Sequence, residues 1–314
     1  MNIKELNKKY EKELIFELSM GASGIGPSKA GVIVENFDSL KEFLEAEKRD
    51  FLEIINRKNK NILNDEQIKS ILTVKKIIPP NLDVRQAWLF KLSYDFIHSQ
   101  VSMVSSLNLD NIDINPLLVE ALDLKEPRDI ISFVIYQSVT RSVVTAWGTC
   151  VENMVKYVGC ESNDARDKSL TGKNFDLKKC LGSEEYYIQV KSGPNTMNVG
   201  MVYSLNETIA KIKAKGKKAF LGMTYGKRDR ISPQIMGNLE DPVKQTKIGR
   251  ELWDFIAEEK DYYKKVVKII SEATTGLLDK NFIELIDDKI DNLVVQWEEK
   301  FKGKQFNEIL EFYI

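Results

Sequence analysis

An alternation of helix and strand patterns in the second half of the chain restricts the possible folds most. Residues 129–157 place apolar side chains at helical spacing. Strand patterns follow at 186–190 and 219–224, and a polar helical stretch at about 202–214 separates them. A chain that alternates in this way builds a sheet with helices packed on it, so we predict a mixed α/β core.

The remainder of the chain has helical patterns. Residues 1–76 are charged and helical in pattern, and Pro79–Pro80 prevents a helix from continuing past them. From residue 249 onwards the pattern is helical again. We therefore expect a helical region at 1–78 and a second domain at 79–314, which contains the α/β core and a helical C-terminal part.

Composition limits the class of protein. The 314 residues are 43% hydrophobic and 30% charged, which is typical of a globular chain long enough for two domains. No apolar run approaches a membrane span and the first residues have no signal-peptide pattern, so we expect a cytoplasmic protein without membrane contact. The spacing of Cys150, Cys160 and Cys180 does not match a zinc site and predicts reduced thiols. The net charge of −1 suggests no nucleic-acid partner, although local clusters can matter more than the total.

The predicted strand at 186–190 and the residue that follows it place two polar side chains on one face. Gln189 and Lys191 are two positions apart and point to the same side, whereas the apolar residue between them points to the other. Asp176 comes shortly before, and the segment KKCLGSEE can turn between Asp176 and the strand as a hairpin. Because hidden polar groups must be paired or coordinated, we expect a ligand among these three side chains.

A carboxylate, an amide oxygen and an ammonium group suit metal-assisted hydrolysis of a phosphodiester. Oxygen ligands hold a hard cation such as Mg²⁺, which stabilises charge on the scissile phosphate and lowers the pKa of a bound water. We predict that Asp176 and Gln189 place Mg²⁺ and that Lys191 orients the attacking water or neutralises the developing charge. Since Gln189 brings no charge, a further acid is expected, and Glu152 in the helical segment WGTCVENMV is the candidate. An acid on the solvated edge of a helix is the ordinary alternative for Glu152.

Other potential metal ligands have simpler explanations. Glu184 and Glu185 lie beside the predicted turn, so we expect them to face solvent. His98 is the only histidine and lies in the helical pattern YDFIHSQV, which favours a structural or surface role. The lack of a second histidine argues against a histidine-based metal site.

A glycine-rich segment near the start separates two helical patterns. Gly24 and Gly26 allow positive φ and leave N–H groups free where Lys29 and its neighbours open the second helix, a position that favours a phosphate. With the continuation FDSLKEF, the segment resembles a helix-hairpin-helix motif, which implies contact with the DNA backbone through Gly24, Gly26 and Lys29. An ordinary turn between packed helices and a protein-binding hairpin are the alternatives.

Basic residues gather on both sides of the 219–224 strand. One cluster precedes it and consists of Lys211, Lys213, Lys215, Lys217 and Lys218. These lysines could contact phosphates, and a solvated helix face explains them equally well. We expect DNA contacts from residues that follow the two strands, namely Ser192, Asn195, Thr196, Asn198, Lys227, Arg228 and Arg230.

The combination of Asp176, Gln189 and Lys191 resembles the PD-(D/E)xK nuclease superfamily in an Asp…Gln-x-Lys variant. The chain departs from the usual pattern at Gln189, where an acid is common, and at Phe175, where a proline is common. The order of the segments INPLL, VKSGPNTMN, FLGMTYGKRD and GRELWDFI is similar to that in type II restriction endonucleases of the TdeIII kind, over about residues 110–275. The resemblance implies a restriction-endonuclease-like core, in which a central mixed sheet is flanked by helices.

The resemblance also implies a function. Such an enzyme would cut double-stranded DNA in the presence of Mg²⁺, at a short palindrome with an unspecified central base. We expect a homodimer, because a two-fold dimer supplies one active site for each strand of a palindrome. A DNA methyltransferase that protects the host DNA is implied, but not as a physical partner. Two alternatives stay open: another DNA nuclease, such as a transposase subunit or a junction resolvase, and a non-catalytic DNA-binding protein with a decayed nuclease fold.

Overall fold

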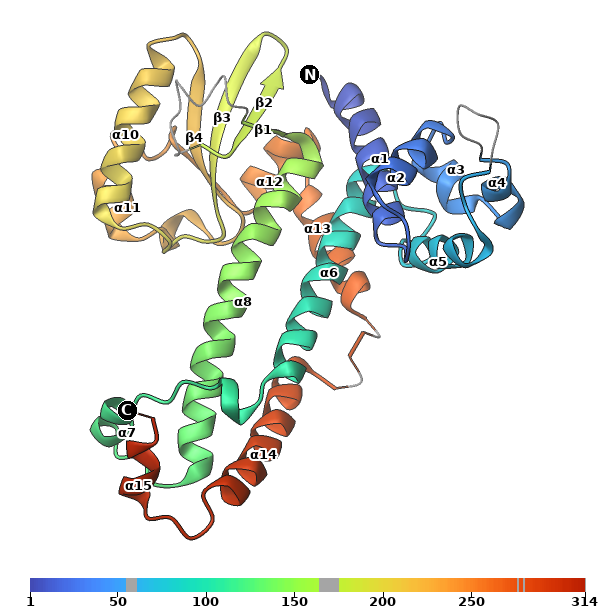
Figure 1. Ribbon diagram of the computed structural model, residues 1–314. Coiled ribbons are helices and arrows are strands. Elements are labelled where there is room, and N and C mark those ends of the chain that lie inside the picture. The colour runs from blue at the N-terminus through green and yellow to red at the C-terminus, as the bar shows by residue number, and fades with distance from the viewer. Residues whose placement is uncertain (55–60, 164–174, 276, 279, 314) are drawn as a thin grey trace. The chain divides into compact units, whose positions relative to one another are not determined.

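The chain forms two compact units, each built from two stretches of sequence. The computed structural model describes residues 1–54, 61–163, 175–275, 277–278 and 280–313 (Figure 1). Unit 1 consists of Met1–Leu92 and Cys150–Glu272, and unit 2 consists of Ser93–Thr149 and Ala273–Ile314. The expected boundary near residue 78 falls inside unit 1, so a separate domain at 1–78 stays a prediction.

Unit 1 begins with helices. They are α1 (Ile3–Met20), α2 (Pro27–Glu35), α3 (Leu40–Glu45), α4 (Lys48–Leu52) and α5 (Asp65–Lys75). Side chains cap the N-termini of several of these helices. Asn2, Ser39 and Asn64 each accept a hydrogen bond from N–H groups of the first turn. Apolar side chains such as Leu14 and Phe43 are fully buried among these helices. The helical pattern of the N-terminal region is therefore present in the structure.

Unit 1 also contains a mixed sheet, which has five strands within the described residues. The strands lie in the order β1 (Glu161–Ser162), β2 (Leu177–Leu181), β3 (Glu184–Lys191), β4 (Lys218–Met223) and β5 (Thr246–Ile248). β2 pairs antiparallel with β1 and β3, whereas β4 pairs parallel with β3 and β5. The predicted fold class, a mixed α/β core, is confirmed.

Helices cover both faces of this sheet (Figure 1). The helices involved are α8 (Pro127–Gly159), α10 (Val199–Lys213), α11 (Pro233–Asn238) and α12 (Arg250–Ala257). Tyr187 of β3 packs in one apolar cluster with Leu205 of α10. On the opposite face, a Cβ at Gly222 would lie 3.0 Å from Leu252 of α12 and 3.2 Å from Ile188. Odd-numbered residues of β3 thus face α10 and even-numbered residues face α12, as strand alternation requires.

The C-terminal end of α8 is fixed inside unit 1. The ring of Tyr157 on α8 stacks on Trp88 of α6 (Val84–Ser106), with centroids 3.6 Å apart. The indole N–H of Trp88 donates a hydrogen bond of 2.9 Å to the carbonyl of Tyr10 on α1. Gly159, the last residue of α8, lies so close to α12 that a Cβ would be 2.3 Å from the carbonyl oxygen of Ile256. These contacts set the position of the last turns of α8, which carry Glu152.

In the described residues of unit 2, all regular secondary structure is helical. It contains parts of α6 and α8, the short helix η1 (Leu109–Asn111), α7 (Pro116–Ala121), α14 (Phe282–Lys300) and α15 (Phe306–Glu311), whereas α13 (Tyr262–Thr274) belongs mainly to unit 1. Ile135, Ile290 and Trp297 are buried in its core. Among the described residues of both units, no helix is both long enough and apolar enough to cross a membrane.

Candidate active site

The β2–β3 hairpin brings Asp176 beside Gln189. Leu181 pairs with Glu184 across a two-residue turn, in which Gly182 has a φ of 58°. This left-handed conformation favours glycine. At the open end Leu177 pairs with Ile188, and the N–H of Asp176 donates a hydrogen bond of 3.2 Å to the carbonyl of Ile188. Asp176 therefore lies directly before the paired strands, opposite Gln189.

Asp176 is held by the backbone of the strand that carries the other candidates. Its carboxylate accepts a hydrogen bond of 3.2 Å from the N–H of Val190. Burial raises the pKa of Asp176, and the Val190 N–H and the charge of Lys191 oppose that effect. Phe175, which stands where a proline is common, is buried in the apolar cluster beneath α10 and anchors the chain next to Asp176.

Gln189 has a buried side chain with one unsatisfied atom. Only 7% of the residue is exposed, and its Oε1 has no hydrogen-bond partner among the described residues. A buried oxygen without a partner costs about 1–3 kcal/mol. This oxygen is therefore available to a cation or to a donor on a bound molecule.

Lys191 and Glu152 complete the group. Lys191 is the last residue of β3 and is half-buried, and Glu152 is half-buried near the end of α8. Burial raises the pKa of Glu152, the carboxylate of Asp176 raises it further, and the ammonium of Lys191 lowers it. Glu152 is therefore within electrostatic range of both residues, although they are distant in sequence. The structure brings together all four residues predicted for the catalytic site.

The donor atoms of this group fit a hard divalent cation. Two carboxylates and the orphaned amide oxygen of Gln189 are oxygen donors, the type that Mg²⁺ prefers. A cluster of three or more histidine, cysteine or acidic residues that could hold a metal ion does not occur in the described part of the chain. A metal at this site would therefore depend on Gln189 in addition to Asp176 and Glu152.

The rival acids lie at the other end of β3. Glu184 forms an ion pair with Lys218, and Glu185 pairs with Lys217 at 2.7 Å and Lys178 at 3.4 Å. These lysines lower the pKa of both carboxyl groups by hydrogen bonding and charge. Glu184 and Glu185 therefore have structural partners at the turn.

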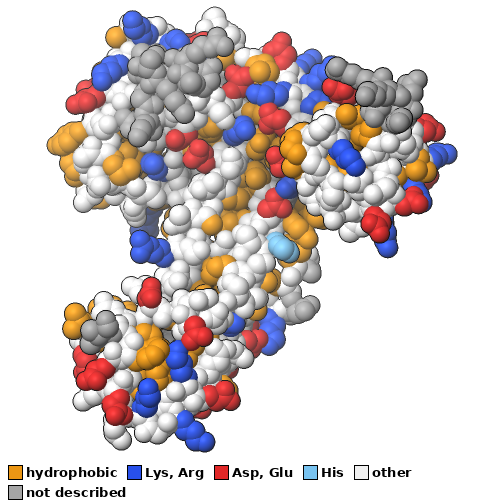
Figure 2. Space-filling model, viewed as in Figure 1, with side chains coloured by type: hydrophobic (Ala, Val, Ile, Leu, Met, Phe, Trp, Pro, Cys, Tyr) orange, Lys and Arg blue, Asp and Glu red, His pale blue; other side chains and the backbone are white. Residues whose placement is uncertain are grey.

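Other predicted positions lie outside the group. His98 is exposed on α6 within unit 2, with its ring stacked at 6.1 Å from Tyr94. In the lysine cluster before β4, Lys211, Lys213 and Lys215 are exposed. On the face drawn in Figure 2, basic and acidic side chains are interspersed.

The carboxyl ends of β3 and β4 are joined beyond their last paired residues. The N–H of Thr224 donates to the carbonyl of Lys191 at 3.0 Å, and its hydroxyl donates to the carbonyl of Ser192 at 2.8 Å. The indole N–H of Trp253 on α12 donates to the carbonyl of Thr224 at 2.8 Å. Thr224 and Trp253 thus fix the backbone that carries Lys191. Sequence reasoning missed both, because these contacts depend on pairing between distant segments.

Several predicted DNA contacts have partners within the chain. The amide oxygen of Asn198 caps α10 by accepting from the N–H of Met201 at 2.9 Å, and the hydroxyl of Thr196 donates to the carbonyl of Gly193 at 2.8 Å. Asn195, Thr196 and Asn198 are all exposed. Ser192 is half-buried.

The basic residues that follow β4 also differ in whether their side chains have partners within the chain. The guanidinium of Arg228 donates to the hydroxyl of Thr246 at 2.7 Å and pairs with Glu251 at 2.8 Å. Lys227 and Arg230 are exposed, and neither forms an ion pair within the described part of the chain. Lys227 and Arg230 are thus the basic side chains of this segment that are available to a partner.

The N-terminal glycine segment joins α1 to α2 as a tight turn. Gly24 has a φ of 74°, and its carbonyl accepts a hydrogen bond of 2.6 Å from the amide of Gln67 on α5. The amide oxygen of Gln67 accepts a hydrogen bond of 2.9 Å from the ammonium of Lys29. Gly26 precedes α2, is exposed and has open space around its Cα. The start of α2 is therefore open, whereas Lys29 is bound to α5.

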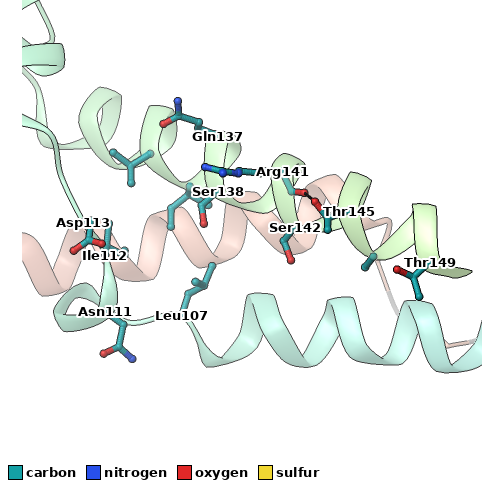
Figure 3. A pocket seen from close by; sticks show the side chains of 13 residues that line it. Leu107, Asn111, Ile112, Asp113, Gln137, Ser138, Arg141, Ser142, Thr145 and Thr149 are labelled. Atoms are coloured by element: carbon teal, nitrogen blue, oxygen red, sulfur yellow. Dashed lines mark hydrogen bonds between the residues drawn. The ribbon is translucent and has the colours of Figure 1, made fainter. Parts of the chain in front are cut away.

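A separate hollow lies in unit 2. It has a volume of about 720 Å³ and lies between the loop after α6 and the middle of α8, where it is lined by polar residues such as Asn111, Ser138 and Arg141 (Figure 3). None of the predicted site residues lines it. The hollow is therefore not the candidate active site.

Comparison with known families identifies the chain. The family model for the type II restriction endonuclease EcoO109I matches residues 90–276. The chain belongs to this family. The region matched to EcoO109I includes Glu152, Asp176, Gln189 and Lys191, and it leaves the N-terminal glycine segment outside. A comparison with curated proteins found no match. The predicted likeness to a restriction endonuclease is confirmed, and the likeness to the TdeIII kind stays a prediction.

Proposed function

We propose that this protein is a type II restriction endonuclease that hydrolyses both strands of double-stranded DNA at a specific sequence and requires Mg²⁺. The observation that carries the proposal is the grouping of Asp176, Gln189, Lys191 and Glu152 within the region matched to the EcoO109I family. The resemblance noted in the sequence suggests a short palindrome with an unspecified central base. It also suggests a methyltransferase that protects the host DNA.

Each residue of the group would have a distinct role. Asp176, Glu152 and the Oε1 of Gln189 would hold the metal ion, which when bound stabilises charge on the phosphate and lowers the pKa of a water. Lys191 would donate hydrogen bonds from Nζ to the attacking water and offset the negative charge that develops on the phosphate oxygens. Thr224 and Trp253 would keep the backbone of Lys191 in place.

The DNA would be held by side chains around the carboxyl ends of β3 and β4. Asn195, Lys227 and Arg230 are exposed there and would contact DNA directly. The remaining predicted contacts are half-buried or hydrogen-bonded within the chain, namely Ser192, Thr196, Asn198 and Arg228. They would contact DNA through their backbone, or through side chains that exchange their present hydrogen-bond partners for the DNA.

The test is digestion of long unmethylated phage DNA with and without Mg²⁺. Wild-type protein should give discrete fragments only with the metal, and Lys191→Ala should leave the DNA intact. Lys218→Ala is a matched control, because Lys218 is an exposed lysine that pairs with Glu184 at the turn end of the hairpin, and it should cut normally. A smear of products would favour a nonspecific or repair nuclease. Intact DNA that is still bound in a gel shift would favour a non-catalytic DNA-binding protein.

The α1–α2 turn is proposed as a second DNA contact, through Gly24, Gly26 and the start of α2. Ser28→Glu places a negative charge in the first turn of α2, where the helix dipole favours it, so helix stability should not fall. If a phosphate binds there, the same charge should weaken DNA affinity. Thr73→Glu adds the same charge at an exposed position of α5 and serves as the control for the change in net charge. Equal affinities of the two variants in a gel shift would argue for a turn that only packs α1 against α2.

A further inference from the structure

Three glycines let the chain segments that follow β3, β4 and β5 lie close together. A Cβ at Gly193 would be 2.5 Å from the ring of Tyr225, and one at Gly226 would be 3.2 Å from Pro194. Gly249 has a φ of 54°, and a Cβ there would be 2.7 Å from the carbonyl oxygen of Gly226. The surface next to Lys191 is thus built from tightly packed backbone.

Tyr225 lies on the outside of this packed backbone. Its phenol end covers Gly193, which is buried and follows Lys191 by two residues. Yet 51% of Tyr225 remains exposed, and it has no hydrogen-bond or aromatic partner among the described residues. One part of the ring is therefore seated on the chain beside Lys191, and the rest is open.

Tyr225 comes shortly after β4 and lies beside the carboxyl end of β3, where Lys191 is found. Met223 pairs with Lys191, and the hydrogen bond from the N–H of Thr224 to the carbonyl of Lys191 continues that pairing by one residue. Tyr225 follows Met223 by two positions, as Gly193 follows Lys191. Tyr225 and Gly193 thus lie equally far beyond the paired ends of β4 and β3, and the two residues are in contact.

We propose that the open part of the Tyr225 ring binds the DNA strand next to the phosphate that is cut, by packing against the sugar and the base edge of the adjoining nucleotide. The proposal rests on the proposed nuclease function, because it takes DNA to be the molecule at Lys191. Aromatic rings suit this role, since the sugar of every nucleotide in a duplex presents apolar carbon atoms whatever the sequence. A contact of this kind adds affinity without neutralising a phosphate, and the exposed Lys227 and Arg230 beside it in sequence would supply the charge.

The test measures DNA affinity in the Lys191→Ala protein, where cleavage does not interfere. Tyr225→Ala should weaken binding of the DNA by about 5- to 30-fold, because the apolar surface that the ring buries against the nucleotide is lost. The slope of log affinity against log salt should not change, because the ring carries no charge. Tyr225→Phe keeps the ring and should bind within about 2-fold of the parent, since the expected loss comes from the ring.

Two control variants separate this role from others. Lys227→Ala should reduce the salt slope, by about 0.9 if one phosphate contact is lost, and Tyr263→Ala, which truncates a half-buried ring on α13, should leave binding unchanged. Affinity of Tyr225→Ala equal to the parent would overturn the proposal, even if cleavage by Tyr225→Ala alone were slow, because Tyr225 would then only support the backbone at Gly193. If the wild type cuts no DNA, the nuclease function fails by itself, and the affinity comparison on phage DNA fragments still decides the role of Tyr225.

Discussion

Gln189 combines burial with an amide oxygen that no described residue satisfies. Gln189→Leu removes this orphaned oxygen and puts a slightly shorter, apolar side chain in its place. We expect the free energy of unfolding to stay the same or to rise by about 1–3 kcal/mol, because the unsatisfied oxygen is lost. Cleavage should fall at least tenfold if the oxygen holds the metal ion. Urea unfolding and single-turnover cleavage measure the two effects. A variant that is less stable and fully active would contradict a ligand role for Gln189.

The two carboxyl groups of the site predict an unusual pH dependence. Burial raises the pKa of Asp176 above its ordinary 3.8 and that of Glu152 above its ordinary 4.5. A carboxyl group with a raised pKa in the folded state costs stability where it is ionised. The cost is absent below the ordinary pKa, grows as the pH rises through the window between the two values, and is complete above the raised pKa.

Asp176→Asn and Glu152→Gln should remove that cost. Each variant should be more stable than the wild type at neutral pH. The difference should vanish below the ordinary pKa, which is 3.8 for Asp176 and 4.5 for Glu152, as thermal unfolding at a series of pH values would show. Cleavage by the wild type should decline as the pH falls through the raised pKa values, because a protonated carboxyl group does not hold the metal. Variants that are less stable than the wild type at neutral pH would mean that both carboxylates are structural.

At the level of secondary-structure elements, the sequence patterns predicted the long helices and strands but not the short strands. The helix α8 and strands β3 and β4 bury apolar faces over enough residues to show their period, and they lie within a few residues of the predicted ranges. β1 has two residues and β5 has three, too few for a period, and they exist because they pair with β2 and β4. Pairing across the sheet also explains why the contact between Tyr225 and Gly193 was not visible in the sequence.

The junction of α8 with α12 gives a prediction at the same level. Gly159→Ala would place a Cβ 2.3 Å from the carbonyl oxygen of Ile256, so α12 must shift. We expect destabilisation of about 1–3 kcal/mol, as for overpacked cores. Gly148→Ala on the same helix meets nothing within 4 Å and should stabilise by up to about 1 kcal/mol through helix propensity. Urea unfolding of both variants measures the contrast, and equal stabilities would mean that the α8–α12 contact is loose.

For the whole molecule, the decisive prediction is assembly. One chain contains one group of Asp176, Gln189, Lys191 and Glu152, and a duplex has two strands to cut. A two-fold dimer would present one such group to each strand of a palindrome. We expect light scattering to give twice the 36.0 kDa of one chain.

Plasmid cleavage tests the consequence of that assembly. A supercoiled plasmid with a single site should become linear in one binding event, with little nicked circle at any time. A monomer would have to bind twice, so nicked circles would accumulate first and then decay. A monomeric mass together with that two-step course would refute the homodimer and favour the nicking of one strand at a time. A dimeric mass with accumulating nicked circles would instead mean that the two active sites do not reach both strands together, and the dimer would then serve recognition rather than paired cleavage.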